Sequence, residues 1–452
     1  MFNIKKIFIT SLVASTALTG NTYADEKEKD NDKPKNVIVL VGDGMGPEFN
    51  SAYRHYKDNP ETPKIERTAF DNNLLGQMST DPENTKDENI TDSAAAGTAM
   101  ATGEKTYNGA VSVDNNKKEL ESVLEHAKKN DKSTGLVVTS DLTDATPAAF
   151  GAHEENRDNK NEIAKDYYNE KINGKHKIDV LLGGGANYFG EKNGNLDKKF
   201  KEDGYDILTD KKELNESEGK QVLGTFADET LPYAIDRKTD TPSLKDMTSS
   251  AIQKMNKNDK GFFLMVEGSQ IDKSAHPNDP TGVMSEMEDF EQAYKEAIEF
   301  AKKDKNTLVV TTGDHSTGGL TMGTRGEQSF HPETIKQMNH SARYMEEEIL
   351  KDENIDKVIK EGYGFKLKEE EIEKIKEASQ EMKSDKDEDY KEQNPLEKAL
   401  TEPVNERSNT GWTSDSHVGH DTSIYGYGVN KEMFEGAMDN TKFNQNLFKQ
   451  YK

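Results

Sequence analysis

The sequence predicts an α/β fold in which a central, mostly parallel sheet is flanked by helices on both faces. Five short runs are nearly continuous in apolar and β-branched residues, as expected of strands that are covered on both sides. Helical patterns lie between several of these runs, and this alternation is typical of a parallel sheet. Together with a sixth run near the C-terminus, the predicted strands are Val37–Val41, Leu136–Thr139, Ile178–Leu182, Phe262–Val266, Leu308–Thr312 and Ser423–Tyr427.

The clearest predicted helix runs from Ser285 to Lys302 and leads into the strand Leu308–Thr312. Ser285 and Glu288 resemble a capping box, which would place the start of the helix at Ser285. Apolar residues recur at helical spacing along it and form one apolar face. These residues are Met287, Phe290, Tyr294, Ala297, Ile298 and Ala301.

Residues 1–24 are typical of a secretory signal peptide. Lys5 and Lys6 form a basic start, Ile7–Leu18 is an apolar run, and Thr22-Tyr23-Ala24 offers a cleavage site before Asp25. The apolar run is too short to span a bilayer comfortably, and no later run is long enough to do so. We therefore expect an exported bacterial protein, secreted or associated with the cell wall, that has no transmembrane segment.

Residues 25–35 are strongly charged, so we expect a flexible leader there and a single folded domain over 36–452. Two polar stretches, 154–237 and 328–407, look like additions to the α/β core. The second stretch predicts a charged insertion near the active-site side of the sheet, with short helical patterns of its own. It would either cap the entrance of the site or contribute to a contact between two copies of the chain.

Composition excludes several classes of protein. The net charge of −25 disfavours binding to nucleic acids and to anionic membranes. It would also repel a phosphorylated substrate, unless bound metal ions supplied local positive charge. Because the chain has no cysteine, disulfides and thiolate metal sites are excluded. Any transition metal must therefore bind to histidine, aspartate, glutamate or hydroxyl groups.

Acidic and histidine residues follow three of the predicted strands. Asp43 follows the first strand, Glu267 follows the fourth, and Asp314 with His315 follows the fifth. Ligands of parallel α/β sheets collect at the carboxyl ends of the strands. An adjacent aspartate and histidine at the end of a buried strand are costly to desolvate unless they coordinate something. These positions therefore predict a metal or catalytic site at one edge of the sheet.

Ser93 lies at the start of an alanine-rich, helix-forming run, where either Asp92 or Ser93 would be the N-cap. A helix N-terminus presents free N–H groups and a partial positive charge that suit a phosphate, although a serine there can also be a cap and nothing more. Asp272 and His276 are four residues apart, so they can face one metal or form a surface ion pair. His417 and His420 supply further imidazoles.

Together these groups are suited to the hydrolysis of a phosphate monoester. That reaction requires an activated nucleophile, stabilisation of the leaving group and shielding of the phosphoryl oxygens, and two neighbouring metal ions can supply all three. An arginine fork can bind two phosphate oxygens at once. The glycines around Asp43 match neither a phosphate-binding loop nor a dinucleotide fingerprint, so a nucleotide-binding fold of those kinds is disfavoured.

The motifs that contain these residues resemble those of the bacterial alkaline phosphatase family. The matching motifs occur in the family's order and span about residues 36–429. They are Gly42–Gly46, Thr91–Ala95, Asp144–Ala149, Val266–Gly268, Asp272–His276, Asp314-His315 and His417.

The resemblance implies that Ser93 is the nucleophile and forms a phosphoserine, and that the site holds two zinc ions and one magnesium ion. Asp43, Asp314 and His315, with Ser93 itself, would hold the zinc that activates the serine. Asp272, His276 and His417 would hold the zinc that stabilises the leaving oxygen and then activates water. Asp43, Thr146 and Glu267 would hold magnesium, with Asp144 acting through water.

The resemblance also implies that Arg157 binds the phosphate, that Asp92 positions Arg157, and that Lys273 reaches the phosphate or the magnesium shell through water. His417 fits the family pattern better than His420, because Gly419 follows it as in the family. A site that binds only the phosphate would accept many leaving groups, so broad monoester specificity and a role in phosphate scavenging are expected. The family commonly forms dimers, so we expect a homodimer.

Four alternatives remain, of which the first two belong to the same superfamily and the last two to other classes. A sulfatase requires a Cys- or Ser-x-Pro-x-Arg motif, which Ser93–Gly97 lacks. A phosphodiesterase would normally use threonine as its nucleophile and lack a counterpart of Arg157. A metal-binding protein without turnover would bind zinc but release no phosphate. An ester-type serine hydrolase is disfavoured, because Ser93 is not in a Gly-x-Ser-x-Gly elbow.

Overall fold

The computed structural model describes residues 33–83, 88–324, 326–351, 353–384 and 394–451. The predicted signal peptide, residues 1–24, and most of the predicted leader lie outside the described residues. Within the described part of the chain, no helix is both long enough and apolar enough to cross a membrane.

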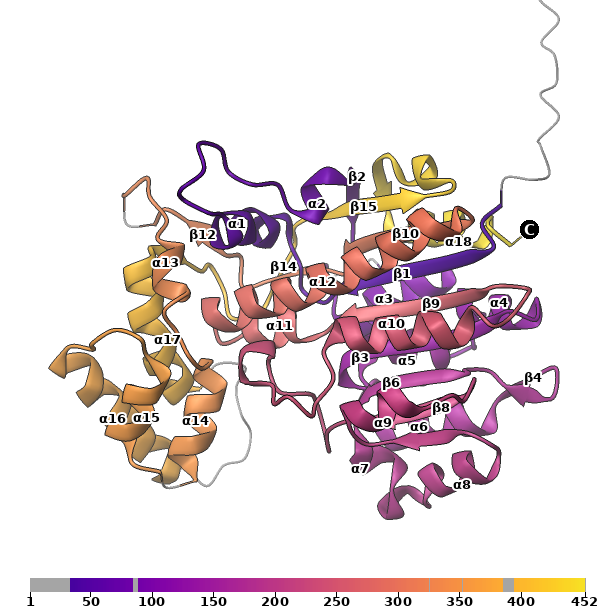
Figure 1. Ribbon diagram of the computed structural model, residues 1–452, viewed down its shortest axis with the longest axis horizontal. Helices are drawn as coiled ribbons and strands as arrows, with labels where there is room; N and C mark the ends of the chain where they lie inside the picture. Colours follow the sequence, from indigo (N-terminus) through magenta and orange to yellow (C-terminus); the bar gives the residue numbers. More distant parts are fainter. Residues whose placement is uncertain (1–32, 84–87, 325, 352, 385–393, 452) are drawn as a thin grey trace, which may run out of the picture. The chain divides into compact units, whose positions relative to one another are not determined.

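A 10-stranded sheet forms the centre of the described structure, in the order β16-β2-β15-β10-β1-β9-β3-β6-β8-β7 (Figure 1). From β10 to β7 all neighbouring strands are parallel, whereas β15 runs antiparallel to both β10 and β2. The strands are β1 (Asn36–Gly42), β2 (Leu74–Ser79), β3 (Ser133–Asp141), β6 (Val180–Gly184), β7 (Asp206–Leu208), β8 (Val222–Thr225), β9 (Phe262–Gly268), β10 (Thr307–Gly313), β15 (Thr422–Gly428) and β16 (Gly436–Asp439).

Each of the six predicted strands overlaps a strand of this sheet, which confirms the predicted α/β fold. The sequence did not reveal β2, β7, β8 and β16, which lie toward the two ends of the sheet. Three further pairs of strands lie outside it. They are β4 (Lys171–Ile172) with β5 (Lys175–His176), β11 (Ser316–Thr317) with β14 (His417–Val418), and β12 (Thr321–Met322) with β13 (Thr410–Gly411).

Helices cover both faces of the sheet, and each face has its own apolar core. In β1, Val37, Val39 and Val41 belong to one core, whereas Ile38 and Leu40 belong to the other. This alternation follows from the two-residue repeat of a strand. The first core includes residues of α3 (Ser93–Thr102), α4 (Val123–Lys129), α5 (Ala145–Gly151), α6 (Lys160–Asn169), α8 (Leu196–Glu202) and α18 (Asn440–Phe448).

The second core contains residues of α1 (Pro47–Lys57), α10 (Leu244–Met255) and α12 (Pro280–Asp304). Figure 1 shows α10 and α12 in front of the sheet and α3 and α5 behind it. Four shorter helices lie in connections between these elements. They are α2 (Ala69–Asn72), α7 (Ala186–Phe189), α9 (Lys211–Glu216) and α11 (Gln270–Ala275).

The start predicted for the long helix was wrong. Helix α12 begins at Pro280, and Asp279 is its N-cap, with a side chain that accepts a hydrogen bond from the Thr281 backbone N–H. Proline is favoured in the first turn of a helix, since its missing N–H would be unpaired there anyway. Ser285 is therefore inside the helix, where its hydroxyl donates to the Gly282 carbonyl oxygen at 2.8 Å instead of forming a capping box.

Helices occupy much of the stretch predicted as a charged insertion. They are α13 (Pro332–Ile335), α14 (Ala342–Leu350), α15 (Ile355–Gly362), α16 (Glu369–Ser384) and α17 (Pro395–Ser408). Their apolar residues join the same core as α12. Asn405 of α17 donates from Nδ2 to the Asn278 carbonyl oxygen at 2.9 Å, so this helical segment contacts the loop that follows α11.

Candidate active site

Three neighbouring strands bring several of the predicted site residues to one edge of the sheet. Asp43 follows β1, Asp314 and His315 follow β10, and Glu267 is the next-to-last residue of β9. Gly42 is in register with both Gly313 and Gly268, so the ends of these three strands lie side by side. The register of a parallel sheet thus gathers acidic residues that are more than 200 positions apart in the sequence.

Ser93 is the first residue of α3, and its hydroxyl is not used to cap the helix. Asp92 is the N-cap and accepts a hydrogen bond from the Ala95 backbone N–H at 2.9 Å. The Ser93 Oγ atom lies 3.1 Å from His315 Nε2 and 3.4 Å from Asp43 Oδ1. Ser93 is buried, so this hydroxyl is held against the ends of β1 and β10.

Asp43, Asp314 and His315 form one buried group of possible metal ligands, with ligand atoms that all lie within 4.8 Å of one another. His315 Nε2 lies 3.3 Å from Asp43 Oδ1 and 3.3 Å from Asp314 Oδ2. Asp314 Oδ1 accepts hydrogen bonds from the backbone N–H groups of Gly44 and His315, each at 2.9 Å. Asp314 Oδ2 has no hydrogen-bond partner among the described residues.

Asp272, His276 and His417 form a second group. His276 Nε2 lies 3.2 Å from Asp272 Oδ2, and His417 Nε2 lies 3.6 Å from Asp272 Oδ1. The two imidazole rings have centroids 5.3 Å apart. His315 stacks on His417 with centroids 3.6 Å apart, so the two groups of ligands are in contact.

Second partners orient the three imidazoles. His276 Nδ1 donates to the Asp415 carbonyl oxygen at 2.7 Å, and His417 Nδ1 donates to the Thr91 carbonyl oxygen at 2.9 Å. Thr317 Oγ1 donates its only hydrogen to Asp272 Oδ1, so its contact with His315 Nδ1, at 3.2 Å, requires that Nδ1 donate. All three rings therefore turn the lone pair of Nε2 toward the site, as metal-binding histidines do.

Burial also favours the neutral form of two of these rings. It lowers the pKa of His315 to about 4. Burial, with a contribution from His315, lowers the pKa of His417 to about 4 as well. A neutral imidazole is the form that binds a metal ion. Both side chains are thus ready to act as ligands at neutral and alkaline pH.

The residues expected to hold magnesium contain unpaired buried oxygens. Thr146 Oγ1 in α5 and Glu267 Oε2 have no hydrogen-bond partner among the described residues. A buried polar atom without a partner carries a desolvation penalty, which a bound cation would remove. These two atoms and Asp314 Oδ2 therefore fit a site that holds metal ions.

The electrostatics of the carboxylates lead to the same conclusion. Burial raises the pKa of Asp43 well above its usual value, and Asp314 and Asp272 raise it further. Burial and then Asp144 raise the pKa of Glu267 to about 8. Burial, with Asp272, raises the pKa of Asp314 to about 7. Carboxyl groups in this environment are stabilised as anions when cations bind between them.

Arg157 lies across two aspartates at the edge of the site. Its guanidinium contacts Asp92 Oδ2 through NH1 at 3.2 Å and Asp144 Oδ1 through NH2 at 3.2 Å. Partial burial opposes the charged form, but Asp144 and Asp92 outweigh this effect and raise the pKa of Arg157. The side chain is therefore a cation that is held in place between two carboxylates.

Lys273, in α11, supplies a second cation. Its Nζ lies 2.8 Å from Asp144 Oδ2. Burial acts to raise the pKa of Asp144, but Lys273, Lys160 and Arg157 outweigh it and hold this pKa well below the usual range. Asp144 is thus an anion that is shared between the two cations Lys273 and Arg157.

Sequence reasoning missed some residues that complete the site. Thr317 contacts His315 of the first group and Asp272 of the second. It lies only two positions after His315, so its place in the sequence could have drawn attention to it. Thr91 contributes through a backbone carbonyl, for which no side-chain pattern exists. His420 is more than half exposed and lies 3.7 Å from Glu48, so the structure brings His417 to the cluster and not His420.

Comparisons with known proteins show the family to which the chain belongs. A family model described as alkaline phosphatase matches residues 34–452. The chain belongs to the alkaline phosphatase family. It is 50% identical to alkaline phosphatase 3 of Bacillus subtilis (strain 168) over 451 residues, which covers 98% of this chain and 96% of that protein. It is also 50% identical to alkaline phosphatase 4 of the same strain over 444 residues, covering 98% and 94%.

Among solved structures, a cold-active alkaline phosphatase from the psychrophile Shewanella sp. is similar, with a TM-score of 0.84 and 37% identity over 92% of this chain and 100% of that chain. As an alkaline phosphatase, this chain is a phosphomonoester hydrolase. The family depends on metal ions, and this member provides two candidate metal-binding groups that share His315. They are Asp43, Asp314 and His315, and Asp272, His315 and His417.

Proposed function

We propose that this alkaline phosphatase hydrolyses phosphate monoesters of many alcohols through a phosphoserine intermediate on Ser93. The observation that carries the proposal is the position of the Ser93 hydroxyl, 3.1 Å from His315 Nε2 and 3.4 Å from Asp43 Oδ1, at the N-terminus of α3. Because Asp92 caps the helix, the hydroxyl is available for attack on phosphorus. The N-terminus of α3 also favours an anionic group beside Ser93.

The site would hold two zinc ions and one magnesium ion. Asp43, Asp314, His315 and Ser93 would hold one zinc, and Asp272, His276 and His417 the other. Asp43, Thr146 and Glu267 would hold the magnesium, with Asp144 acting through water. When bound, such ions supply Lewis-acid charge that activates oxygen nucleophiles and stabilises oxygen leaving groups.

The chain's own groups account for orientation and for the two displacements. Arg157, positioned by Asp92 at 3.2 Å, would bind two oxygens of the phosphate and turn the phosphorus toward Ser93. The Ser93 Oγ–P bond would form while the bond from phosphorus to the alcohol oxygen breaks, and the alcohol would leave with a proton. Water would then break the Oγ–P bond, which restores the Ser93 hydroxyl and releases phosphate.

Specificity for the phosphate group follows from these contacts. Arg157 and Lys273 both pair with Asp144, and both would contact the phosphate or its immediate surroundings. None of these contacts depends on the alcohol, so we expect a wide range of leaving groups. A monoester is expected to react much faster than the matching diester, because the second ester group removes a charged oxygen from the contact with Arg157.

The test is hydrolysis of an aryl phosphate by the mature chain with zinc and magnesium present. We expect turnover that rises into the alkaline range, is abolished by a chelator and returns when the metals are restored. A comparison with a bis-aryl phosphate distinguishes a monoesterase from a diesterase. Bound zinc without release of phosphate would contradict the proposal and would support a metal-binding protein without turnover.

We propose further that the enzyme is exported and acts as a homodimer in phosphate scavenging. The apolar run Ile7–Leu18, followed by Thr22-Tyr23-Ala24, supports cleavage before Asp25. Mass spectrometry of the protein from culture medium or cell wall would then find Asp25 as the first residue. Light scattering would give twice the mass of the mature chain, and a monomer mass would contradict the proposed dimer.

A further inference from the structure

A pocket lies at the opposite edge of the sheet from Ser93. Its volume is about 580 Å³. It is lined by residues at the amino ends of the parallel strands, such as Ser133 at the start of β3, Asp179 just before β6 and Gln221 just before β8. The catalytic groups follow the carboxyl ends of the same set of parallel strands. The two sites are therefore separated by the length of the strands.

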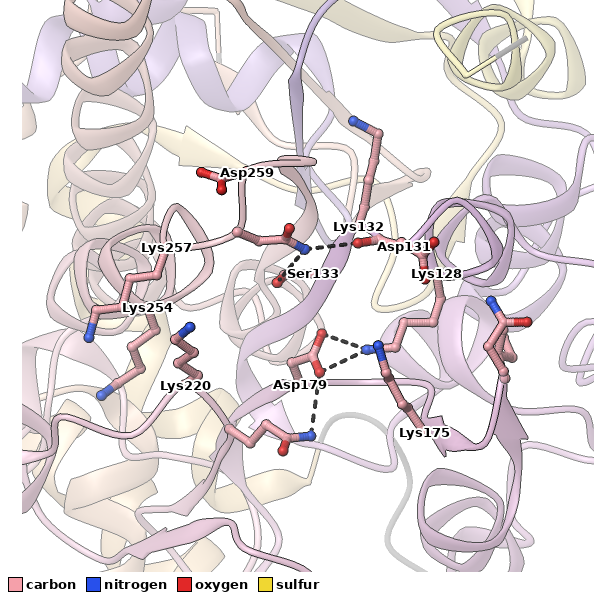
Figure 2. Close-up of a pocket in the computed structure, with 14 residues that line it drawn as sticks. Lys128, Asp131, Lys132, Ser133, Lys175, Asp179, Lys220, Lys254, Lys257 and Asp259 are labelled. Carbon is pink, nitrogen blue, oxygen red and sulfur yellow. Dashed lines mark hydrogen bonds and ion pairs between the residues drawn. The ribbon is translucent and has the colours of Figure 1, made fainter.

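The pocket is positively charged, in a chain whose net charge is −25. Six lysines and three aspartates line it, which leaves a surplus of three positive charges. Figure 2 shows lysines on both sides of Asp179, with Lys220, Lys254 and Lys257 on one side and Lys128 and Lys175 on the other. The lining lysines are Lys128, Lys132, Lys175, Lys220, Lys254 and Lys257, and the aspartates are Asp131, Asp179 and Asp259.

Several of these lysines have structural partners. Lys128 Nζ is paired with both carboxylate oxygens of Asp179, at 2.8 and 2.7 Å. Lys132 donates to the carbonyl oxygens of Lys35 and Lys260, and Lys254 donates to the carbonyl oxygen of Ser217. These contacts give Lys128, Lys132 and Lys254 partners within the structure itself.

Lys175 and Lys220 are different. Lys175 belongs to the β4–β5 hairpin and Lys220 to the loop between α9 and β8. Both side chains are exposed, and neither makes a hydrogen bond or an ion pair with any residue in the described ranges. Neither lysine lies at the end of a helix, and neither is paired with a carboxylate among the described residues. They therefore bring two uncompensated ammonium groups to the lining of one pocket.

Two lysines of the lining hold their protons less tightly than usual, chiefly because they are buried. Burial lowers the pKa of Lys132 to about 8, and Lys35 adds to this effect. Burial, together with Lys257, lowers the pKa of Lys254. An anion in the pocket would stabilise the charged form of both ammonium groups. The pocket is thus arranged to gain favourable electrostatic energy when a polyanion enters.

The lining restricts the class of ligand. Ile172 is the one apolar side chain among the lining residues, and no aromatic residue lines the pocket, so a nucleobase would have nothing to stack on. The volume lies in the range of pockets that bind a small molecule. We propose that this lysine pocket binds a short, non-aromatic oligophosphate, with Lys175 and Lys220 as its principal contacts. The site is independent of the catalytic site and of the function proposed for it.

The first test localises the binding. The full chain carrying Ser93→Ala, loaded with metals, is treated with an amine-acylating reagent with and without tripolyphosphate and excess magnesium, and labelling is quantified at each lysine by mass spectrometry. The Ser93→Ala change prevents consumption of the probe. We expect labelling of Lys175 and Lys220 to fall several-fold. Lys245 and Lys366, which are exposed and outside the pocket, serve as internal controls and are expected not to change.

The second test measures affinity by calorimetry. Lys175→Gln with Lys220→Gln should weaken binding of tripolyphosphate at the lysine pocket by about tenfold or more, since each charge-assisted hydrogen bond contributes substantially. The matched variant Lys245→Gln with Lys366→Gln removes the same charge elsewhere and should bind like the parent. In the Ser93-containing enzyme, neither pair should alter hydrolysis of an aryl phosphate.

Three results would overturn the proposal. One is equal labelling of Lys175 and Lys220 with and without tripolyphosphate. Another is equal loss of affinity in both double variants, which would indicate a general effect of net charge. The third is protection by a nucleoside triphosphate but not by tripolyphosphate, which would assign the pocket to a ligand with a base.

Discussion

The Ser93 Oγ atom lies 3.1 Å from His315 Nε2, although the two residues belong to elements that are 222 positions apart in the sequence. This contact joins the start of α3 to the end of β10. It exists because Asp92 caps α3 and leaves the serine hydroxyl free. The same imidazole is held from behind by Thr317, which also contacts Asp272, so the serine faces a ligand set that is fixed in orientation.

Ser93→Ala should abolish most of the activity and leave metal binding largely intact. Loss of a nucleophile typically lowers kcat by roughly 10³-fold or more, because the residual site can only bind and polarise the substrate. The measurement is kcat for an aryl phosphate together with zinc content by elemental analysis. Ser285→Ala, which removes a hydroxyl inside α12, is the matched control and should keep full activity. Full activity in Ser93→Ala would refute the assignment of the nucleophile.

Arg157→Lys should retain charge but lose the fork that contacts Asp92 and Asp144. We expect kcat/KM to fall by about tenfold to a hundredfold, because a bidentate contact to phosphate is replaced by a single point charge. Inhibition by inorganic phosphate should weaken in parallel, which is measured from its inhibition constant. Arg157→Ala should weaken it further. An unchanged inhibition constant in both variants would show that Arg157 does not contact the phosphate.

Gly44→Ala should lower the affinity for zinc. Gly44 has a positive φ of 67°, and a Cβ there would lie 2.8 Å from Asp272 Oδ1 and 2.7 Å from Thr317 Oγ1. The added methyl group would therefore displace a proposed ligand and the side chain that orients it. Gly204→Ala is the matched control, because its φ is 98° and nothing lies within 4 Å of the added atom. Equal zinc affinity of the two variants in a competition titration with a chelator would contradict this prediction.

Glu397→Gln should stabilise the protein at alkaline pH. Burial, and then Glu346, raise the pKa of Glu397 to about 8, with Asp279 adding to the effect and Arg343 opposing it. Since the folded state holds this proton more tightly than the unfolded state, stability is fully present below the ordinary glutamate pKa and is lost as pH rises toward about 8. The amide cannot ionise, so the melting temperature of Glu397→Gln should exceed that of the parent near pH 9 and differ less near pH 5.

The control for this change is Glu369→Gln, an exposed glutamate at the start of α16. It should shift the melting temperature little at either pH. A Glu397→Gln protein that loses stability with rising pH as steeply as the parent would show that the carboxyl at position 397 does not carry the proton.

Much of the fold could be predicted from the sequence, because its central strands are buried on both faces. Val37–Val41 and Leu308–Thr312 read as continuous apolar runs and became β1 and β10. By contrast, β2 reads Leu-Leu-Gly-Gln-Met-Ser, is only partly buried and carries no such run. β7 has three residues, too few for any periodicity. The true start of α12 was missed because Asp279 and Pro280 resemble a turn as well as a helix start.

The site was predicted in a different way. The positions of Asp43, Asp314 and His315 at strand ends predicted a metal or catalytic site from the residues themselves. The roles of Ser93 and Arg157, and the assignment of ligands to separate metal ions, were implied only by the resemblance to a family. Thr317 and the Thr91 carbonyl act by holding rings in place, a role that depends on distances in three dimensions. In the charged segment from α13 to α17 the sequence predicted short helices. It could not predict which loop they contact, because that depends on how the helices pack.

The most direct test of the account is detection of phosphate on Ser93. The metal-loaded enzyme is incubated with a phosphate monoester, quenched in acid and digested, and the peptide that contains Ser93 is analysed by mass spectrometry. The account predicts a phosphorylated peptide with the modification at Ser93, absent without metals and absent from the Ser93→Ala protein. Steady hydrolysis with the modification at another residue, or with no phosphorylated peptide under conditions where the intermediate is trapped, would contradict it.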